Sequence, residues 1–280
     1  MPIVLGTCRL CLADCVPLQS SHIIPAAIFN RLRPSTAEAK KFGLGGQVQI
    51  SGGKAFSKSN DHKENLLCSA CEANFCSTET EVLHLFANAD RSFPLWDALG
   101  NYRPNFLGVH PCEVPRGVNA ISLSRFALSV LWRASVSKAQ PAFSKIALGH
   151  FEDRARRALF TSLDAWPDGT HLDVTIIDDN DGGTTQSSII FPTQWQLRGG
   201  GLACIFLLCG VLFTFVLDDE LIPDWHYFRS ANAFGSTLGI AQPATFDLDL
   251  YFLNQTNAKP VGVFAAYVKN IQQRAFGIST

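Results

Sequence analysis

Cys8-Arg9-Leu10-Cys11 and Cys68-Ser69-Ala70-Cys71 are the two stretches that decide how the first part of this chain folds. Each is a C-x2-C pair, and four thiolates from two such pairs can close a tetrahedral zinc site. A small unit held in this way buries little apolar surface, so the metal supplies much of its folding energy. We therefore predict that the four cysteines of these pairs bind one structural Zn²⁺: Cys8, Cys11, Cys68 and Cys71.

The alternative to a zinc site is a set of four buried free thiols. Cys15 and Cys76 lie close enough in sequence to serve as substitute ligands, although neither belongs to a C-x2-C pair. A disulfide framework does not fit the chain, because its nine cysteines are an odd number spread over 280 residues. This usage predicts a reducing, cytoplasmic location, and the first residues show no secretory signal.

The composition is that of a folded protein, with 47% hydrophobic and 17% charged residues. Its length allows one large domain or two of ordinary size. The net charge of −1 gives no overall basic field that would attract nucleic acid. Residues 1–66 nevertheless carry eight Lys or Arg and four Asp or Glu, a local net charge of +4 that is compatible with a phosphate-facing surface.

The apolar run at residues 202–217, LACIFLLCGVLFTFVL, raises the question of a membrane span. It is shorter than the ~20 residues that a helix needs to cross a bilayer, and Gly210 interrupts it. Phe, Val and Leu dominate the run, so we predict two buried strands that turn near Cys209 and Gly210. A membrane-associated protein that uses this segment is a weaker alternative.

The pattern along the chain predicts an α+β protein of two parts. Residues 1–95 form a zinc-binding domain. Residues 90–118 contain four prolines and are expected to lack regular structure, and residues 96–118 of this stretch form the linker. Residues 119–280 form an α+β domain in which helices pack on a mainly antiparallel sheet. The sequence does not assign a role to this second domain, although it offers a surface for a protein partner or a second copy of the chain.

Local periodicity predicts the individual elements. Helices are expected after Pro25, from Cys71 to about Phe86, from Asn119 to about Ser137, between Pro141 and Trp166, and over 261–276. Strands are expected at 48–50, 172–176, 188–191 and 245–252, beside the two strands within 202–217.

The segment Ser21-His22-Ile23-Ile24-Pro25 lies between the two Cys pairs, and Asn65 stands just ahead of the second pair. This order resembles the HNH (ββα-metal) nucleases, in the variant whose nuclease motif is braced by a treble-clef zinc site. The resemblance covers residues 8–80 and leaves the rest of the chain without a comparable motif. It implies an HNH-like treble-clef fold for the zinc-binding domain.

The resemblance also implies roles for His22 and Asn65. In that family the His is a general base, which takes a proton from the water that attacks phosphorus. A divalent cation beside it stabilises the leaving oxygen. The Asn orients the His. This chain departs from the family at Ser21, where an acidic metal ligand is usual. The alternatives are a structural His22 that donates to a backbone carbonyl and an Asn65 that serves only in a turn.

Glu72 is the second departure, because the family's usual signature is C-x2-C-H. A carboxylate can replace the imidazole as a ligand for Mg²⁺ or Mn²⁺. Glu79 lies two helical turns further along the same expected face, so both carboxylates could point toward His22. The alternative is an acidic helix face in contact with solvent.

Two further polar segments contain residue types that can bind a metal ion. Asp61 and His62 precede Asn65 and could supply a missing ligand, although loop residues of this kind are usually solvated. Residues 178–183, DDNDGG, resemble a Ca²⁺ loop only in part, since the bidentate Glu of an EF-hand is lacking. A turn between strands fits this segment better.

The resemblance implies a metal-dependent nuclease that cleaves nucleic acid, with DNA as the expected substrate and bacterial restriction or phage defence as the setting. Its catalytic residues would be His22, Asn65 and Glu72, with Mg²⁺ or Mn²⁺ bound by His22, Glu72 and Glu79. The rival is a zinc-braced module that binds nucleic acid or protein without cleaving it. The residues at Ser21 and Glu72 favour this rival, because both replace expected ligands.

Overall fold

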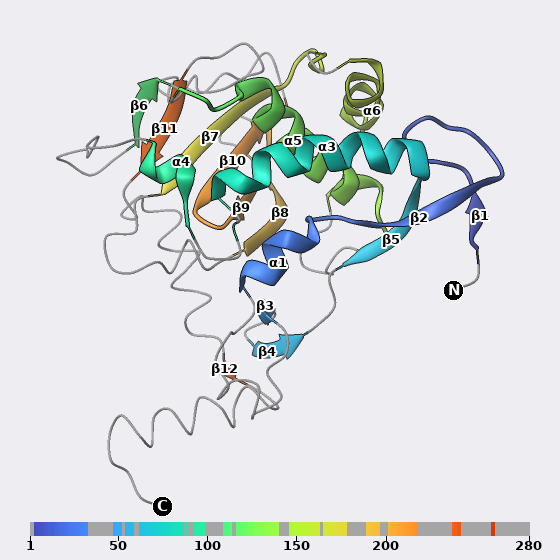
Figure 1. Cartoon of the computed structure of the whole chain (residues 1–280), viewed down its shortest axis with the longest axis horizontal. Coiled ribbons are helices and arrows are strands. Elements are labelled where there is room, and N and C mark those ends of the chain that lie inside the picture. The colour runs from blue at the N-terminus through green and yellow to red at the C-terminus, as the bar shows by residue number, and fades with distance from the viewer. Residues whose placement is uncertain are drawn as a thin grey trace, which may run out of the picture.

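The chain folds into helices packed against mainly antiparallel strands, which confirms the α+β prediction (Figure 1). Among the residues that the structure describes, the strands form two three-stranded sheets and one six-stranded sheet. This computed structural model describes residues 3–32, 47–51, 54–58, 62–86, 88, 92–98, 109–113, 116–139, 146–162, 165–177, 189–196, 201–217, 237–241 and 259–260.

The first sheet carries the cysteine pairs and the His22 segment. Its order is β1 (Leu5–Gly6), β2 (Val16–His22) and β5 (Lys63–Cys68), and both pairings are antiparallel. Helix α3 (Ser69–Phe86) follows β5 without a loop. Strands β2 and β5 and helix α3 therefore form one ββα unit, although a long segment separates β2 from β5.

The segment between β2 and β5 contains the helix and strand expected there. Helix α1 (Ala26–Leu32) begins directly after Pro25, as a proline-led first turn favours. Strands β3 (Gln47–Ser51) and β4 (Lys54–Lys58) form an antiparallel hairpin, and β12 (Lys259–Pro260) pairs with β4 in parallel. The strand predicted at 48–50 is confirmed.

The six-stranded sheet holds the apolar second part of the chain. Four of its five strand pairings are antiparallel, and only β11 with β7 is parallel. Its strands, in spatial order, are β6 (Val109–Glu113), β11 (Thr237–Ala241), β7 (His171–Ile177), β10 (Val211–Val216), β9 (Leu202–Leu208) and β8 (Ile189–Gln196).

The apolar run at 202–217 forms two buried strands, β9 and β10, as predicted. They are joined by Cys209 and Gly210, which have φ values of 51° and 88°. Positive φ at both central residues is the geometry of a type I′ hairpin turn, which suits the twist of paired strands. Within the described part of the chain, no helix has the length and apolar character needed to span a bilayer.

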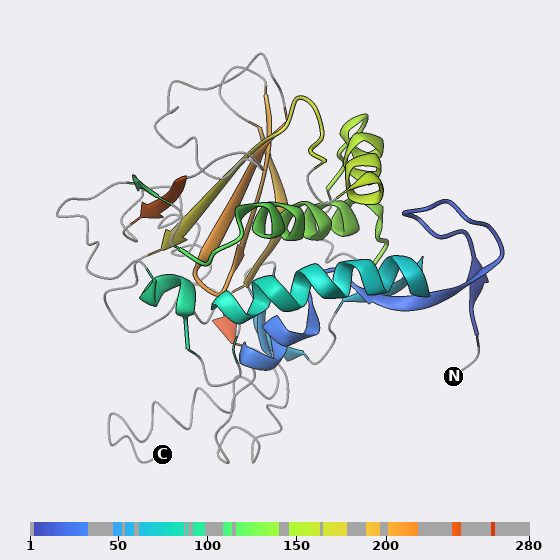
Figure 2. The same ribbon diagram turned by 45° about the horizontal axis from the view of Figure 1, so that its top comes forward.

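Helices α5 (Ala120–Val136) and α6 (Phe151–Thr161) connect the two halves of the fold. Helix α5 begins at Asn119, whose side chain accepts hydrogen bonds from the backbone N–H groups of Ile121 and Ser122, and such a cap stabilises a helix start. Helices α3 and α5 run side by side, and α5 also contacts β8 (Figure 2).

One hydrophobic cluster extends through both predicted parts. It includes Phe75 of α3, Phe126 and Trp132 of α5, and Phe213 of the six-stranded sheet. Edge-to-face ring contacts join Phe75 to Trp132 and Phe86 to Phe126. The part that carries the four cysteines and the second part thus share a core, and about half of the predicted linker lies outside the described residues.

The expectation that residues 90–118 lack regular structure was wrong in two places. Helix α4 (Pro94–Asp97) starts with Pro94, and proline is well suited to the first turn of a helix. Strand β6 includes Pro111 but lies at the edge of its sheet, where a missing N–H donor is tolerated. In this region Pro94 therefore starts a helix and Pro111 lies within an edge strand. Strand β11 was not predicted either.

Several other predictions can be placed. The helix expected within 141–166 is α6, which is shorter than that interval. The strands expected at 172–176 and 188–191 are β7 and β8. The predicted strand at 245–252, helix at 261–276 and turn at 178–183 lie outside the described residues, as does Asp61.

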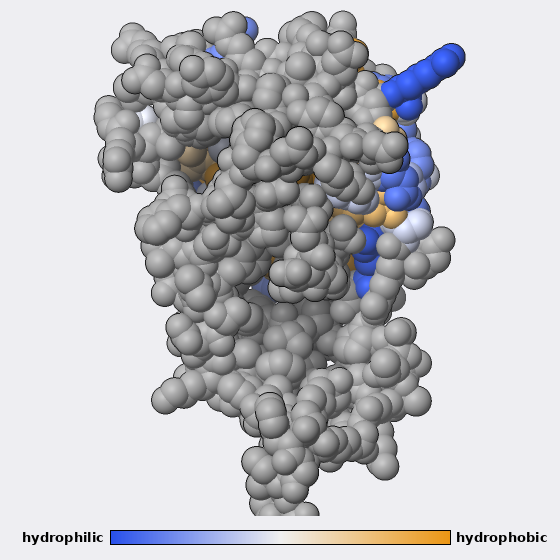
Figure 3. All heavy atoms as spheres, turned by 90° about the vertical axis from the view of Figure 1, so that its left-hand side faces the viewer, coloured by the Kyte–Doolittle hydropathy of each residue, from blue (hydrophilic) through white to orange (hydrophobic). Residues whose placement is uncertain are grey.

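Where surface atoms are coloured in Figure 3, hydrophilic residues cover most of the visible area, with small hydrophobic areas between them.

Candidate metal centre and adjoining histidine site

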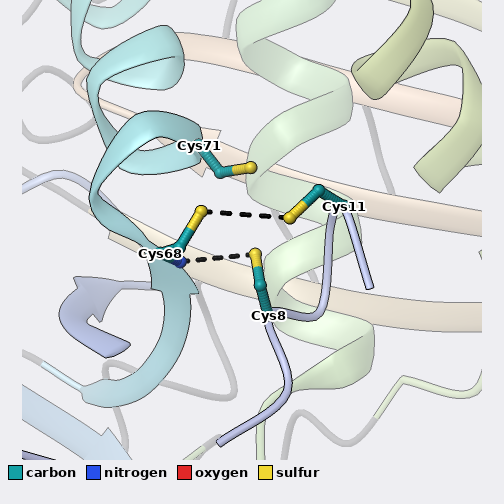
Figure 4. A group of neighbouring side chains, drawn as sticks. All are labelled: Cys8, Cys11, Cys68 and Cys71. Atoms are coloured by element: carbon teal, nitrogen blue, oxygen red, sulfur yellow. Dashed lines mark hydrogen bonds between the residues drawn. The ribbon is translucent and has the colours of Figure 1, made fainter. Parts of the chain in front are cut away.

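The four cysteines are held at the junction of the ββα unit. Cys8 and Cys11 flank a tight turn after β1, in which the Leu12 N–H donates to the Cys8 carbonyl. Cys68 ends β5, and Cys71 lies in the first turn of α3. The turn and the strand–helix junction therefore bring together residues that are far apart in the sequence (Figure 4).

The sulfur positions fit a tetrahedral metal site. One ligand atom from each cysteine lies within 4.8 Å of all the others, and Cys11 Sγ is 3.9 Å from Cys68 Sγ. Zinc–sulfur bonds of ~2.3 Å imply ~3.8 Å between sulfurs at the corners of a tetrahedron. All four thiols are free of disulfide bonds. The predicted convergence is confirmed, and the set is compatible with a structural Zn²⁺.

The electrostatics of the sulfurs differ within the cluster. Burial raises the pKa of Cys8, but backbone N–H donors, first among them that of Cys68, outweigh this effect and lower it to about 7. The Cys68 N–H lies 3.3 Å from Cys8 Sγ. Burial raises the pKa of both Cys11 and Cys71. Cys8 thus loses its proton more readily than Cys11 and Cys71, and metal binding must displace the protons of those two thiols.

The substitute ligands are not needed. Cys15 and Cys76 are exposed and lie outside the four-cysteine group. His62 is buried, its Nδ1 lies 3.0 Å from the Ala139 carbonyl oxygen, and its ring meets Phe191 edge-on at 4.8 Å. It therefore packs in the interior between the two parts of the chain.

Helix α6 contacts the turn at residues 8–11, which carries Cys8 and Cys11 and forms the first knuckle of the cysteine site. The Arg156 guanidinium donates to the Leu10 carbonyl at 3.0 Å, and Arg9 forms a long ion pair with Glu152 at 3.9 Å. Arg156 belongs to the basic part of this helix, whose sequence is basic at Arg154, Arg156 and Arg157. The contact of Arg156 with the knuckle depends on packing, and no local signal in the sequence indicated it.

His22 and Asn65 lie on the same face of the β2–β5 pair. The register places Ser20 opposite Asn65 and His22 opposite Lys63, and side chains alternate along a strand. Asn65 is exposed and His22 is half-buried. The two are therefore diagonal neighbours across the strand pair.

Ser21 lies on the other face and is fully buried. Its hydroxyl donates to the Glu72 carboxylate, with 2.6 Å between Ser21 Oγ and Glu72 Oε2. The two positions at which the chain departs from the HNH pattern are thus in direct contact. A carboxylate is placed beside the end of β2, one residue from His22.

Glu79 has a different partner. It forms an ion pair with Arg133 of α5, and the same guanidinium donates to the His22 carbonyl at 2.8 Å. Among the described residues, the four cysteines are the group of three or more side chains placed to hold a metal ion. His22, Glu72 and Glu79 do not form a second such group there. Arg133 was missed in the sequence because it lies within an apolar helix pattern.

Comparison with models of known protein families, with curated proteins and with solved structures gives no match for this chain. The resemblance to HNH nucleases therefore depends on the motif and its spacing. What the structure adds is the placement of those motif residues around one strand end.

Proposed function

We propose that this protein is an HNH-type metal-dependent nuclease, with His22 as its general base. The observation that carries the proposal is the 2.6 Å hydrogen bond between Ser21 and Glu72. It brings together the two positions at which HNH nucleases hold their cation, immediately beside His22. The zinc site is separate, and its role is to hold β5, α3 and the first knuckle in this arrangement.

The alternation along β2 suits the chemistry of phosphodiester hydrolysis. In an in-line displacement, the attacking and leaving oxygens lie on opposite sides of the phosphorus. A base and a cation-binding carboxylate therefore act from opposite sides of the phosphate, and adjacent positions at a strand end can direct their side chains apart. His22 and Asn65 share one face, whereas Ser21 and Glu72 meet on the other.

In this mechanism the His22 ring accepts a proton from the attacking water, and Asn65 keeps the ring in its orientation. Glu72, with the Ser21 hydroxyl, would hold a hard cation such as Mg²⁺ or Mn²⁺, because both offer oxygen ligands. Such a cation supplies charge stabilisation for the leaving oxygen. Glu79 is reassigned from cation ligand to partner of Arg133.

The test is cleavage of duplex DNA, single-stranded DNA and RNA by the full chain with Mg²⁺, Mn²⁺ or Ni²⁺. We expect His22→Ala to lower the rate by ~10²–10⁴, the usual contribution of general-base catalysis, with zinc content and melting temperature retained. His84→Ala is the matched control, because His84 is an exposed histidine on α3. Equal cleavage by wild type and His22→Ala would contradict the proposal.

Glu72→His probes the cation position. It restores the residue usual in the family, so we expect activity to persist with a preference moved from Mg²⁺ toward softer ions. An unchanged metal preference would show that Glu72 does not bind the cation.

A second candidate function is a nucleic-acid-binding module that does not cleave. The observation that favours it is the pairing of both carboxylates, Glu72 with Ser21 and Glu79 with Arg133. It predicts that wild-type protein retards DNA or RNA in a mobility-shift assay but cleaves neither with any of the three ions.

A further inference from the structure

Arg133 is a buried cation at the centre of the contacts between α5 and the ββα unit. Its side chain is 1% exposed. Nη1 donates to the His22 carbonyl at 2.8 Å, Nη2 pairs with Glu79, and Nε donates to the Ser129 carbonyl at 3.3 Å. The guanidinium also lies over the Phe75 ring, 5.5 Å from its centroid.

These contacts fix the end of strand β2. His22 is its last residue, and its partner in β5, Lys63, is the first residue of that strand. The His22 carbonyl is held from α5, 111 positions along the chain. A guanidinium presents its N–H groups in a rigid planar fork, so one Arg can hold the carbonyl and the Glu79 carboxylate in a set geometry.

We propose that Arg133 is a positioning residue of the His22 site, so that α5 completes the site that the N-terminal motif begins. This inference rests on the proposed function, since positioning matters for a base that must reach a bound water. A displacement of ~1 Å in a catalytic group can cost ~10²-fold in rate. Arg133 acts through the backbone of His22 and through Glu79, not on the substrate.

Arg133→Lys is the first test, with Arg125→Lys as its matched control. Arg125 is also buried on α5 but donates to carbonyls of α6 and its end, including Ser162 at 2.7 Å. We expect Arg133→Lys to lower kcat by ~10- to 100-fold, the cost of a misplaced group, with KM nearly unchanged. Arg125→Lys should lower stability without changing kcat. Equal kcat losses in both variants would overturn the proposal.

A double variant separates positioning from stability. Replacing both members of a buried ion pair by apolar residues of similar volume often restores stability. We expect Arg133→Met/Glu79→Leu to melt near the wild-type temperature while kcat stays low, because the His22 carbonyl still lacks its donor. Recovery of kcat together with the melting temperature would show that Arg133 is only structural. Glu79→Gln, which keeps an acceptor for Arg133, controls for the lost carboxylate.

A readout independent of cleavage distinguishes this inference from the proposed function. The ¹H–¹³C signal of the His22 ring, recorded at one fixed pH, should move in Arg133→Lys and stay in place in Arg125→Lys. If the wild type cleaves nothing but the signal moves as expected, the nuclease proposal fails and the positioning role stands. An unmoved signal in Arg133→Lys would overturn the positioning role.

Discussion

The β1–β2–β5 sheet and the six-stranded sheet are stabilised in different ways. Along β2 only Ser21 is fully buried, whereas most residues of β9 and β10 are buried. Strand β5 adds Leu66 and Leu67 as buried apolar residues, so the first sheet buries less apolar surface than the six-stranded sheet. Its N-terminal segment is joined to β5 and α3 by the four converging cysteines and by contacts such as the hydrogen bond from Ser21 to Glu72. A metal bound by the four cysteines would supply folding energy that this sheet does not obtain from apolar burial.

The six-stranded sheet is stabilised by apolar packing. Phe206, Phe213 and Phe215 are fully buried, and the Phe206 and Phe213 rings stack with centroids 4.8 Å apart. Aromatic side chains bury large areas and gain further from such ring contacts. We therefore expect the two sheets to be destabilised by different substitutions: the first by loss of a cysteine ligand, and the six-stranded sheet by loss of a buried aromatic ring.

The largest effect is expected from Cys68→Ser. It removes one of four thiolates and should reduce bound zinc from about one ion per chain to nearly none, because an incomplete tetrathiolate site holds zinc weakly. Structural zinc contributes ~10–16 kcal/mol in small zinc-binding peptides. We expect rapid amide hydrogen exchange in β2 and β5 and continued protection in β9 and β10.

Zinc content by elemental analysis and exchange by mass spectrometry measure both parts of this prediction. Cys15→Ser is the control, because Cys15 is exposed and lies outside the cluster. Retained zinc in Cys68→Ser would contradict the proposed difference between the two sheets. So would a loss of amide protection in β9 and β10 that is as complete as in β2 and β5.

Phe213→Ala should perturb the other region. Removing a fully buried Phe leaves a cavity and typically costs ~3–5 kcal/mol. We expect a lower free energy of unfolding in urea with zinc content unchanged. Phe160→Ala is the control, because Phe160 is 53% exposed and its loss leaves no cavity. Zinc loss in natively folded Phe213→Ala would show that the two regions are not stabilised separately.

Features set by short stretches of sequence could be predicted. The C-x2-C pairs and the turn at Cys209 and Gly210 each depend on adjacent residues, and the structure agrees with both. Strand β6 could not be found, because Pro111 is read as a breaker unless its position at a sheet edge is known.

The site was predictable only where its residues belong to the motif. Cys8, Cys11, Cys68 and Cys71 were found by spacing alone. Arg133 was not, since it stands in a helix whose pattern is apolar and its partners lie 54 and 111 positions away. Such contacts depend on how α5 packs, which local periodicity does not specify.

The smallest effect is expected at Asp153, where α6 meets the knuckle of the first region. Hydrogen bonds from Arg156 and then Arg157 lower the pKa of this carboxyl. A lowered pKa adds stability above the ordinary carboxylate range, and this stability is lost as the pH falls through the lowered value. Asp153 thus stays ionised throughout pH 5 to 8.

Asp153→Asn should lower the melting temperature by about 1 °C or less, because exposed ion pairs contribute little. The difference from wild type should stay constant between pH 5 and 8, which scanning calorimetry at several pH values can measure. A difference that narrows toward pH 5 would mean that Asp153 titrates there. A much larger decrease in melting temperature would mean that Asp153 orients Arg156 toward the Leu10 carbonyl. The packing of α6 against the turn that carries Cys8 and Cys11 would then depend on Asp153.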